Sequence, residues 1–391
     1  MDKTNRHAFE TRAIHAGQEP DPQSGAVVTP IVQASTFVQD GIGENRGYIY
    51  ARSGNPTRHT VERCIADLEG AEAGYAFPTG LSAAATILEL LDAGAHIVAH
   101  GDLYGGVHRL LTQVRMRSAG FNVTFVDFSD TDAVRAAVTE KTAMLWYETP
   151  SNPTLRIVDI AAISQIGREA NALTVCDNTF CSPYLQNPLA LGADIVMHSA
   201  TKFLCGHSDM MAGIACVGAH VPAEINERLG FLQNSVGAVL SPPDCAQLLR
   251  SVKTLPVRMD RHSSNARAVA EHFAENRDRF GVADVRYPGL PDHPGHEVAA
   301  RQMRDFGAIV TIEVNGGEAR ANEVLKRTSL FQFAVSLGGV ESLIQHPASL
   351  THKAVPEAER AAAGISGGMI RLSVGIEHVT DLIADLEEAF R

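Results

Sequence analysis

A lysine stands alone at the end of an apolar run. The segment DIVMHSATK ends at Lys202, and the nearest lysines along the chain are Lys141 and Lys253. An amine in that position could be a solvated loop residue, a phosphate ligand or a nucleophile that its surroundings make reactive. Ser199 and Thr201, just before it, carry hydroxyls that suit a phosphate, although either hydroxyl could instead cap a helix.

Other groups suited to the same chemistry follow other apolar runs. Gly80 and Leu81 begin a helical pattern, whose N–H groups and dipole favour an anion. Asp177 ends the run LTVCD, and Tyr104 stands beside two glycines in DLYGG. Each has an ordinary alternative, as a turn residue, a cap or a core aromatic. Together, an anion cradle, an amine, a buried acid and a stacking ring predict a site for pyridoxal phosphate (PLP), in which Asp177 would keep the pyridine nitrogen protonated.

Alternating strand and helix patterns would bring these groups together. The apolar runs expected as strands are 74–77, 96–100, 123–128, 143–148, 173–177, 194–198 and 213–218, and helical patterns include 56–72, 82–94 and 159–172. This alternation predicts an α/β fold with a mainly parallel seven-stranded sheet and helices on both faces. Ligands collect at the carboxyl ends of such strands, which is where the groups above stand.

The chain divides into three expected parts. Residues 1–58 are rich in Gly, Pro, Gln and Thr, and we expect an extended N-terminal arm that contacts a neighbouring subunit. Residues 59–250 would form the PLP-binding α/β domain. Residues 251–391 would form a smaller α+β C-terminal domain, with helices at 256–275 and 379–390 and strands at 307–314 and 369–377.

Composition excludes several classes of protein. The formal net charge of −12 argues against nucleic-acid binding, which needs clustered Lys and Arg. No apolar run reaches the length of about 18 residues that a membrane span needs. The polar N-terminus lacks the apolar core of a signal peptide, and six scattered cysteines suggest reduced thiols in a cytoplasmic protein. Cys205 and His207 alone do not make a metal site, so we expect no metal.

Eight motifs, in order from about residue 10 to the end, carry a resemblance to a known family. They are YIYARSGNPT (48–57), PTGLSA (78–83), DLYGG (102–106), ETPSNP (148–153), CDNTF (176–180), HSATKFLCGHSD (198–209), AVSLGGVESLIQHPASLTH (334–352) and IRLSVGIE (370–377). The chain resembles the Cys/Met-metabolism PLP enzymes of fold type I. That group includes cystathionine γ-synthase, cystathionine γ-lyase, methionine γ-lyase and the homoserine-ester sulfhydrylases.

The resemblance implies a role for each cofactor residue. Lys202 matches the lysine that forms the Schiff base, and Asp177 matches the partner of the pyridine nitrogen. Tyr104 matches the stacking tyrosine that also moves protons. The expected phosphate cradle consists of Gly80, Leu81, Ser199 and Thr201.

The resemblance also implies substrate contacts and an assembly. Arg371, with Asn152 and Ser336, matches the clamp on the substrate α-carboxylate, which suits the planar fork of an arginine. Tyr50 and Arg52 match a pair that reaches the phosphate bound by the neighbouring subunit. The family is typically a homotetramer of two active dimers, so we expect self-association.

The reaction within the family stays open. Val335 stands where cystathionine-handling members usually carry Glu, and its apolar side chain favours a substrate without a distal charge. Gly106 stands where methionine γ-lyases usually carry Cys, and Gln233 and Asn234 resemble the cystathionine enzymes. We expect γ-elimination from a γ-substituted L-amino acid, giving a 2-oxo acid and ammonia. The alternatives are a γ-replacement transferase and, third, a non-catalytic PLP binder, which the presence of both lysine and arginine disfavours.

Overall fold

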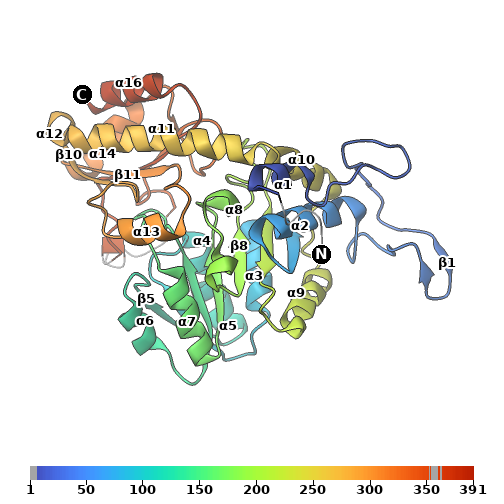
Figure 1. Cartoon of the computed structure of the whole chain (residues 1–391). Coiled ribbons are helices and arrows are strands. Elements are labelled where there is room, and N and C mark those ends of the chain that lie inside the picture. The colour runs from blue at the N-terminus through green and yellow to red at the C-terminus, as the bar shows by residue number, and fades with distance from the viewer. Residues whose placement is uncertain (1–6, 352, 354–359, 362) are drawn as a thin grey trace.

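Two main sheets, besides a small two-stranded one near the N-terminus, organise the chain in a computed structural model that describes residues 7–351, 353, 360–361 and 363–391 (Figure 1). Within these residues a seven-stranded sheet is followed along the chain by a five-stranded one. None of the described helices combines the length and apolar character that crossing a bilayer requires.

The large sheet is the mainly parallel sheet that the sequence predicts. Its strands, in spatial order, are β3 (Ala73–Phe77), β9 (Gly213–Val217), β8 (Ile195–His198), β7 (Leu173–Asp177), β6 (Thr142–Glu148), β4 (His96–His100) and β5 (Asn122–Val126). Only β9 runs antiparallel to its neighbours. The central strands are continuous apolar runs because both of their faces are covered.

Helices cover both faces of this sheet, as expected. On one face, α2 (Pro56–Glu69) and α7 (Ile160–Ala170) pack over the sheet, and on the other α3 (Gly80–Leu88) and α9 (Ala223–Val236) do so. Asn55 caps α2 by accepting bonds from the N–H groups of Thr57 and Arg58, and Gly70 ends it in the left-handed region. The remaining helices here are α4 (Gly105–Arg109), η2 (Leu110–Arg115), α5 (Met116–Ser118), α6 (Thr131–Ala137), α8 (Ser182–Leu185), η3 (Pro188–Leu191) and α10 (Pro242–Val252).

The C-terminal part builds its own core on the smaller sheet. In spatial order the strands are β10 (Val282–Arg286), β11 (Ile309–Val314), β14 (Met369–Ser373), β13 (Leu343–Gln345) and β12 (Gln332–Phe333), all antiparallel except the β12–β13 pair. Helices α11 (Leu255–Glu275) and α16 (Val379–Phe390) contribute to its apolar core. The other helices are α12 (Arg277–Phe280), α13 (His296–Gln302) and α14 (Gly317–Arg327).

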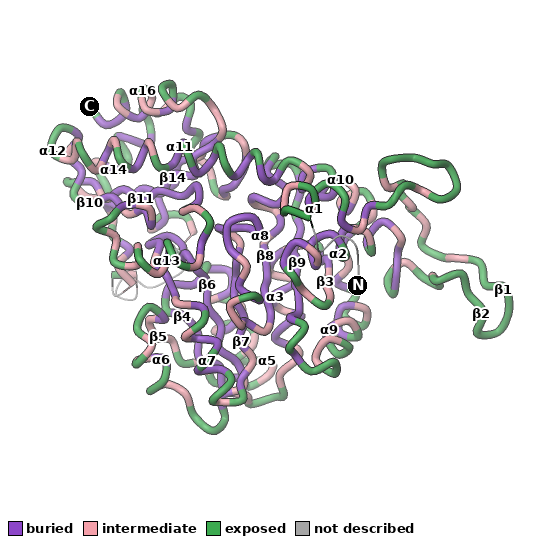
Figure 2. Tube along the Cα trace, viewed as in Figure 1, coloured by how far each residue is buried: buried purple, intermediate pink, exposed green. Residues whose placement is uncertain are grey.

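The N-terminal arm is not uniformly extended. A helix that the sequence did not predict, α1 (Phe9–His15), packs on this chain itself, where Arg12 forms an ion pair with Asp67 of α2 at 2.7 Å. Beyond it, the chain that carries β1 (Gln39–Gly41) and β2 (Glu44–Asn45) extends away from the rest of the molecule and is mostly exposed (Figures 1 and 2).

Candidate active site

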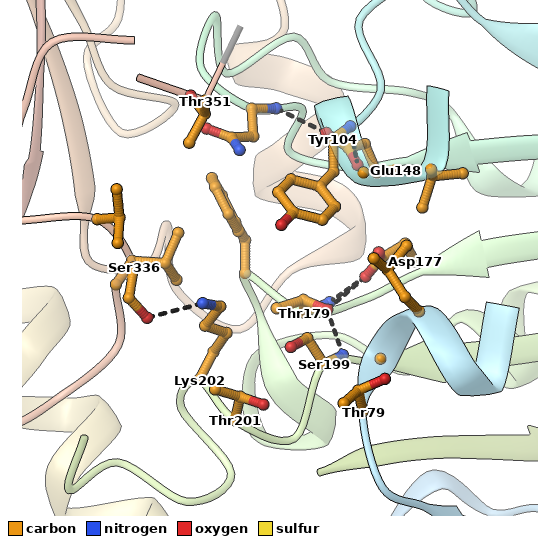
Figure 3. Close-up of a pocket in the computed structure, with 18 of the residues that line it drawn as sticks. Thr79, Tyr104, Glu148, Asp177, Thr179, Ser199, Thr201, Lys202, Ser336 and Thr351 are labelled. Carbon is orange, nitrogen blue, oxygen red and sulfur yellow. Dashed lines mark hydrogen bonds between the residues drawn. The ribbon is translucent and has the colours of Figure 1, made fainter. Parts of the chain in front are cut away.

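A cavity of about 520 Å³ lies at the carboxyl ends of the parallel strands (Figure 3). It has the size of a small-molecule site. The large sheet supplies one side of its wall, and loops and a strand of the C-terminal part supply the other. The expected site residues that line it are Gly80, Leu81, Tyr104, Asn152, Asp177, Ser199, Thr201, Lys202, Val335, Ser336 and Arg371.

Lys202 points into this cavity from the turn after β8. Its Nζ donates a hydrogen bond to Ser336 Oγ at 2.7 Å. Burial, and secondarily the positive charge of Arg371, lowers the pKa of Lys202 to about 8. A substantial fraction of the amine is therefore neutral and nucleophilic near physiological pH.

An anion cradle lies beside the lysine. Helix α3 begins at Gly80, and its cap Thr79 accepts a bond from the N–H of Ser82. A Cβ at position 80 would lie 2.9 Å from Ser199 Cβ, so glycine leaves room that any side chain would fill. The open helix N-terminus and the hydroxyls of Ser199 and Thr201 together suit a phosphate.

A threonine that the sequence reasoning missed connects the acid to this cradle. Thr179 donates from both its backbone N–H and its hydroxyl to Asp177 Oδ1, at 2.9 and 2.5 Å. Its hydroxyl also accepts a bond from the N–H of Ser199 at 2.8 Å. Burial raises the pKa of Asp177, whereas the Thr179 bonds and the nearby His198 lower it. A cationic ligand at Asp177 would offset this desolvation.

A second missed residue, Glu148, ties two loops together. Its carboxylate accepts the N–H of Tyr104 at 3.0 Å and the N–H of Asn152 at 2.9 Å. Burial, with the neighbouring charge of Asp177, raises the pKa of Glu148 well above its ordinary value. Glu148 thereby holds the loop that carries Tyr104 against its own loop, which supplies Asn152. It stands with Asn152 in the ETPSNP segment, but nothing in that segment indicates that it also binds the N–H of Tyr104.

Arg371 closes the opposite wall of the cavity. This buried guanidinium donates from Nη1 to Asn152 Oδ1 at 2.9 Å and from Nη2 to the backbone carbonyl of Ser336 at 2.7 Å. Its Nε has no hydrogen-bond partner within the described residues. Ser336 adopts φ 90°, a costly conformation for a residue with a side chain. That conformation lets Ser336 contact Lys202 and Arg371 at once.

These residues fit PLP, because the cavity offers an anion cradle, a buried carboxylate and an amine of lowered pKa within one space. The family model for the Cys/Met metabolism PLP-dependent enzyme matches residues 10–391. The chain belongs to this family.

Relatives of this family cover almost the whole chain. A cystathionine beta-lyase of Coxiella burnetii is 53% identical over 97% of each chain. A cystathionine gamma-synthase of Mycobacterium tuberculosis is 47% identical over 97% of this chain and 96% of the relative. The solved structure of a cystathionine gamma-lyase from Lactobacillus plantarum, in complex with L-serine, superposes with a TM-score of 0.93 at 43% identity and covers 98% of both chains. The family is therefore established, while the names span lyases and a synthase.

The distal end of the cavity is more open than the cofactor end. We call the part of the cavity around Val335, which has 61% of its surface exposed, the distal end. Met211 and Leu350, which also line the cavity, are exposed as well. Arg109 of α4, which the sequence reasoning did not select, also lines the cavity. Within the described part of the chain, the Arg109 side chain forms no ion pair or hydrogen bond. A cation thus lines the same cavity as these exposed apolar side chains.

The absence of a side chain at Gly106 leaves room for the ring of Tyr104. A Cβ at position 106 would lie 2.4 Å from Cε1 of Tyr104, closer than atoms can approach. The ring therefore occupies the space that a side chain at 106 would need. A cysteine here, as in the methionine γ-lyase pattern, would require Tyr104 to move.

Tyr50 and Arg52 lie away from this cavity. Arg52 donates from Nη1 to the backbone and side-chain oxygens of Asn234, both at 2.9 Å. Its guanidinium also lies 5.7 Å from the centre of the Tyr50 ring. Their expected contact with the phosphate of a neighbouring subunit stays a prediction.

Proposed function

We propose that this family member is a carbon–sulfur lyase that eliminates the γ-substituent of an L-amino acid. The observation that carries proton removal at Cα is the junction at Ser336, which joins Lys202 to the carboxylate clamp, and the choice of γ-elimination is supported by the gamma-lyase of similar structure. Ser336 accepts a bond from Lys202 Nζ through its hydroxyl and one from Arg371 through its carbonyl. A substrate carboxylate held by Arg371 would therefore bring Cα close to the amine.

Each polar group then has one task. Arg371 and Asn152 would bind the α-carboxylate, and Lys202, once its amine is released, would take the proton from Cα. PLP, when bound, supplies the electron sink that makes that proton acidic. Tyr104, whose loop Glu148 fixes, would deliver a proton to the departing sulfur.

We propose cystathionine as the first substrate to test. Relatives of this chain are named for cystathionine chemistry. Arg109 could bind a distal carboxylate, while Val335 offers nothing to a distal ammonium. The position of Gly106 against Tyr104 argues against the methionine γ-lyase pattern. Val335 alone predicts a substrate without a distal charge, but Arg109 in the same cavity favours a thioether with a distal carboxylate over methionine.

Two other reactions have specific support. β-Elimination has the support of the relative at 53% identity, a cystathionine beta-lyase. γ-Replacement on an O-acylhomoserine has the support of the gamma-synthase relative, and Arg109 could also bind the carboxylate of a succinyl group. All three reactions use the same cofactor residues, so their products must separate them.

The test is a product analysis of the purified holoenzyme. Hydrolytic γ-cleavage of cystathionine gives cysteine, 2-oxobutanoate and ammonia, whereas β-cleavage gives homocysteine, pyruvate and ammonia. O-Succinylhomoserine with cysteine would give cystathionine and succinate if the enzyme performs replacement. We expect cysteine and 2-oxobutanoate in parallel amounts. Homocysteine with pyruvate would instead assign β-elimination, and turnover only with added cysteine would assign replacement.

We also propose that two subunits share each site. Apolar side chains along the arm are strongly exposed, including Val28 at 67% and Val38 at 76%. Such exposure favours contact with a second chain. Mixing Arg52→Ala subunits with Lys202→Ala subunits should then restore some activity, because a hybrid dimer contains one site with both residues intact. A mixture as inactive as its parents would refute the shared site.

A further inference from the structure

A buried acid–base pair lies behind the large sheet. Glu69, in the last turn of α2, forms a hydrogen bond with His198 at the end of β8. The distance between Glu69 Oε1 and His198 Nε2 is 2.5 Å. Each residue is only 1% exposed. The two residues are 129 positions apart in the sequence, so no local motif could have predicted the pair.

This pair adjoins two loops of the cavity. His198 directly precedes Ser199, and Asn178, which donates from Nδ2 to the same Glu69 oxygen at 3.3 Å, directly follows Asp177. Successive residues of a strand point to opposite faces of the sheet. Met197 accordingly lines the cavity, while His198 faces α2 on the other side.

The backbone reinforces the same junction. The N–H of Asn178 donates to the carbonyl of Met197 at 3.0 Å, and the Asn178 side chain donates to the carbonyl of Gln186 at 2.8 Å. The ends of β7 and β8 are therefore joined on the hidden face through Glu69. On the cavity face they are joined through Thr179.

Charge gives the pair a second effect. A buried carboxylate is costly unless a cation accompanies it, and His198 is the group positioned to supply that charge. Within the described residues, Glu69 Oε2 and His198 Nδ1 have no hydrogen-bond partners. A positive charge on His198 would also favour the ionised form of Asp177, which lies at the end of the neighbouring strand.

We propose that Glu69 and His198 are positioning residues for the bound cofactor, holding Asp177 and Ser199 at a fixed separation and placing a positive charge behind Asp177. This rests on the site proposed above, in which Asp177 faces the pyridine nitrogen and Ser199 the phosphate. It assigns a role to two groups that touch neither substrate nor cofactor.

The experiment compares substitutions of two buried carboxylates of α2 and of the histidine that pairs with one of them. Glu69→Gln keeps an oxygen acceptor and removes the charge. His198→Gln keeps an N–H donor and removes the cation. Glu62→Gln is the matched control, because Glu62 is also a buried carboxylate of α2 but pairs with Arg58 and binds the N–H of Ala76. The measurements on each holoenzyme are the thermal unfolding temperature, the rate of cofactor release, and the ¹⁵N shift of a labelled cofactor's pyridine nitrogen.

We expect all three variants to unfold at lower temperature. Only Glu69→Gln and His198→Gln should release the cofactor faster, by about 10-fold or more. Loss of a residue that orients the binding residues typically weakens binding by at least that factor. The pyridine nitrogen should also shift toward its unprotonated value in these two. If Glu69→Gln does not fold, the milder His198→Gln decides. Release rates and nitrogen shifts equal to those of Glu62→Gln would make the pair merely structural and overturn the proposal.

A parallel Lys202→Ala sample separates the two levels of failure. If that variant keeps the cofactor's visible band, the proposed site itself is wrong. If it loses the band while Glu69→Gln behaves like Glu62→Gln, only the positioning role fails.

Discussion

The two ends of the cavity differ in burial and in hydrogen bonding. At the cofactor end, Asp177, Thr179 and Ser199 form a chain of hydrogen bonds backed by the buried Glu69–His198 pair. At the distal end, Val335 is 61% exposed and lies beside other exposed apolar side chains. The cofactor end therefore admits one arrangement, while the distal end can change with little structural cost. Enzymes with different reactions can share the first end and differ at the second.

Removing the lysine should break the cofactor end most completely. In the proposed site Lys202 holds the cofactor and takes the Cα proton, so in Lys202→Ala the visible band should vanish and activity should fall by more than about 100-fold. Absorption spectra and steady-state assays measure both. Lys141→Ala, at an exposed lysine just before the N-terminal end of β6, should retain the band and the activity. If the band survives in Lys202→Ala, Lys202 is not the lysine that holds the cofactor.

The sequence predicted the elements behind the cofactor end well. The runs 96–100 and 173–177 coincide with β4 and β7, because strands buried on both faces are continuous apolar segments with clear ends. The helix expected at 82–94 instead begins at Gly80 and ends at Leu88, where the chain continues in shorter turns. Helix α1 was missed because a single buried residue, Ala13, gives almost no apolar period.

The residues that support the site were harder to predict than those that line it. Asp177 and Lys202 stand out because each follows an apolar run. Glu148 and Thr179 stood in recognised segments, but each also binds a backbone N–H group of a distant loop, that of Tyr104 and that of Ser199, which only the folded chain brings near. At the distal end, nothing about Arg109 in the sequence indicates that it lines the cavity.

A methylene at position 106 should disturb the tyrosine without removing the cofactor. Because a Cβ there would lie 2.4 Å from Tyr104 Cε1, Gly106→Cys must displace the ring. Misplacing a catalytic group by about 1 Å can cost about 100-fold, so kcat should fall by about 10- to 100-fold while the band remains. Gly101→Ala is the control, since its Cβ would meet nothing closer than 3.6 Å. Unchanged kcat in Gly106→Cys would show that Tyr104 carries no proton in the slow step.

The pH dependence of cofactor uptake tests how far the cofactor end of the cavity lowers the pKa of Lys202. The pKa of Lys202 is lowered to about 8, so the neutral amine, and with it the uptake rate of the apoprotein, should rise with pH and level off above about 8. Arg371 is the second cause of this lowering, after burial. Arg371→Leu removes a positive charge that disfavours the ammonium, so the midpoint should move to higher pH. A midpoint that does not move would assign the lowering to burial alone, and Lys141→Ala should leave it unchanged.

The smallest effect should come from the distal end. Val335→Glu adds a carboxylate that can pair with the distal ammonium of cystathionine, but the position is 61% exposed, and exposed pairs contribute about 0.2–1 kcal/mol. We therefore expect the ratio of kcat/KM for cystathionine to that for methionine to rise by less than about 5-fold, with the spectrum and thermal stability unchanged. Leu330→Glu adds the same charge at an exposed site that does not line the cavity, and should leave the ratio as it was. A loss of cofactor in Val335→Glu would contradict the separation of the two ends. A rise of the same size in both variants would attribute the effect to overall charge, because only a local carboxylate can distinguish one substrate end from another.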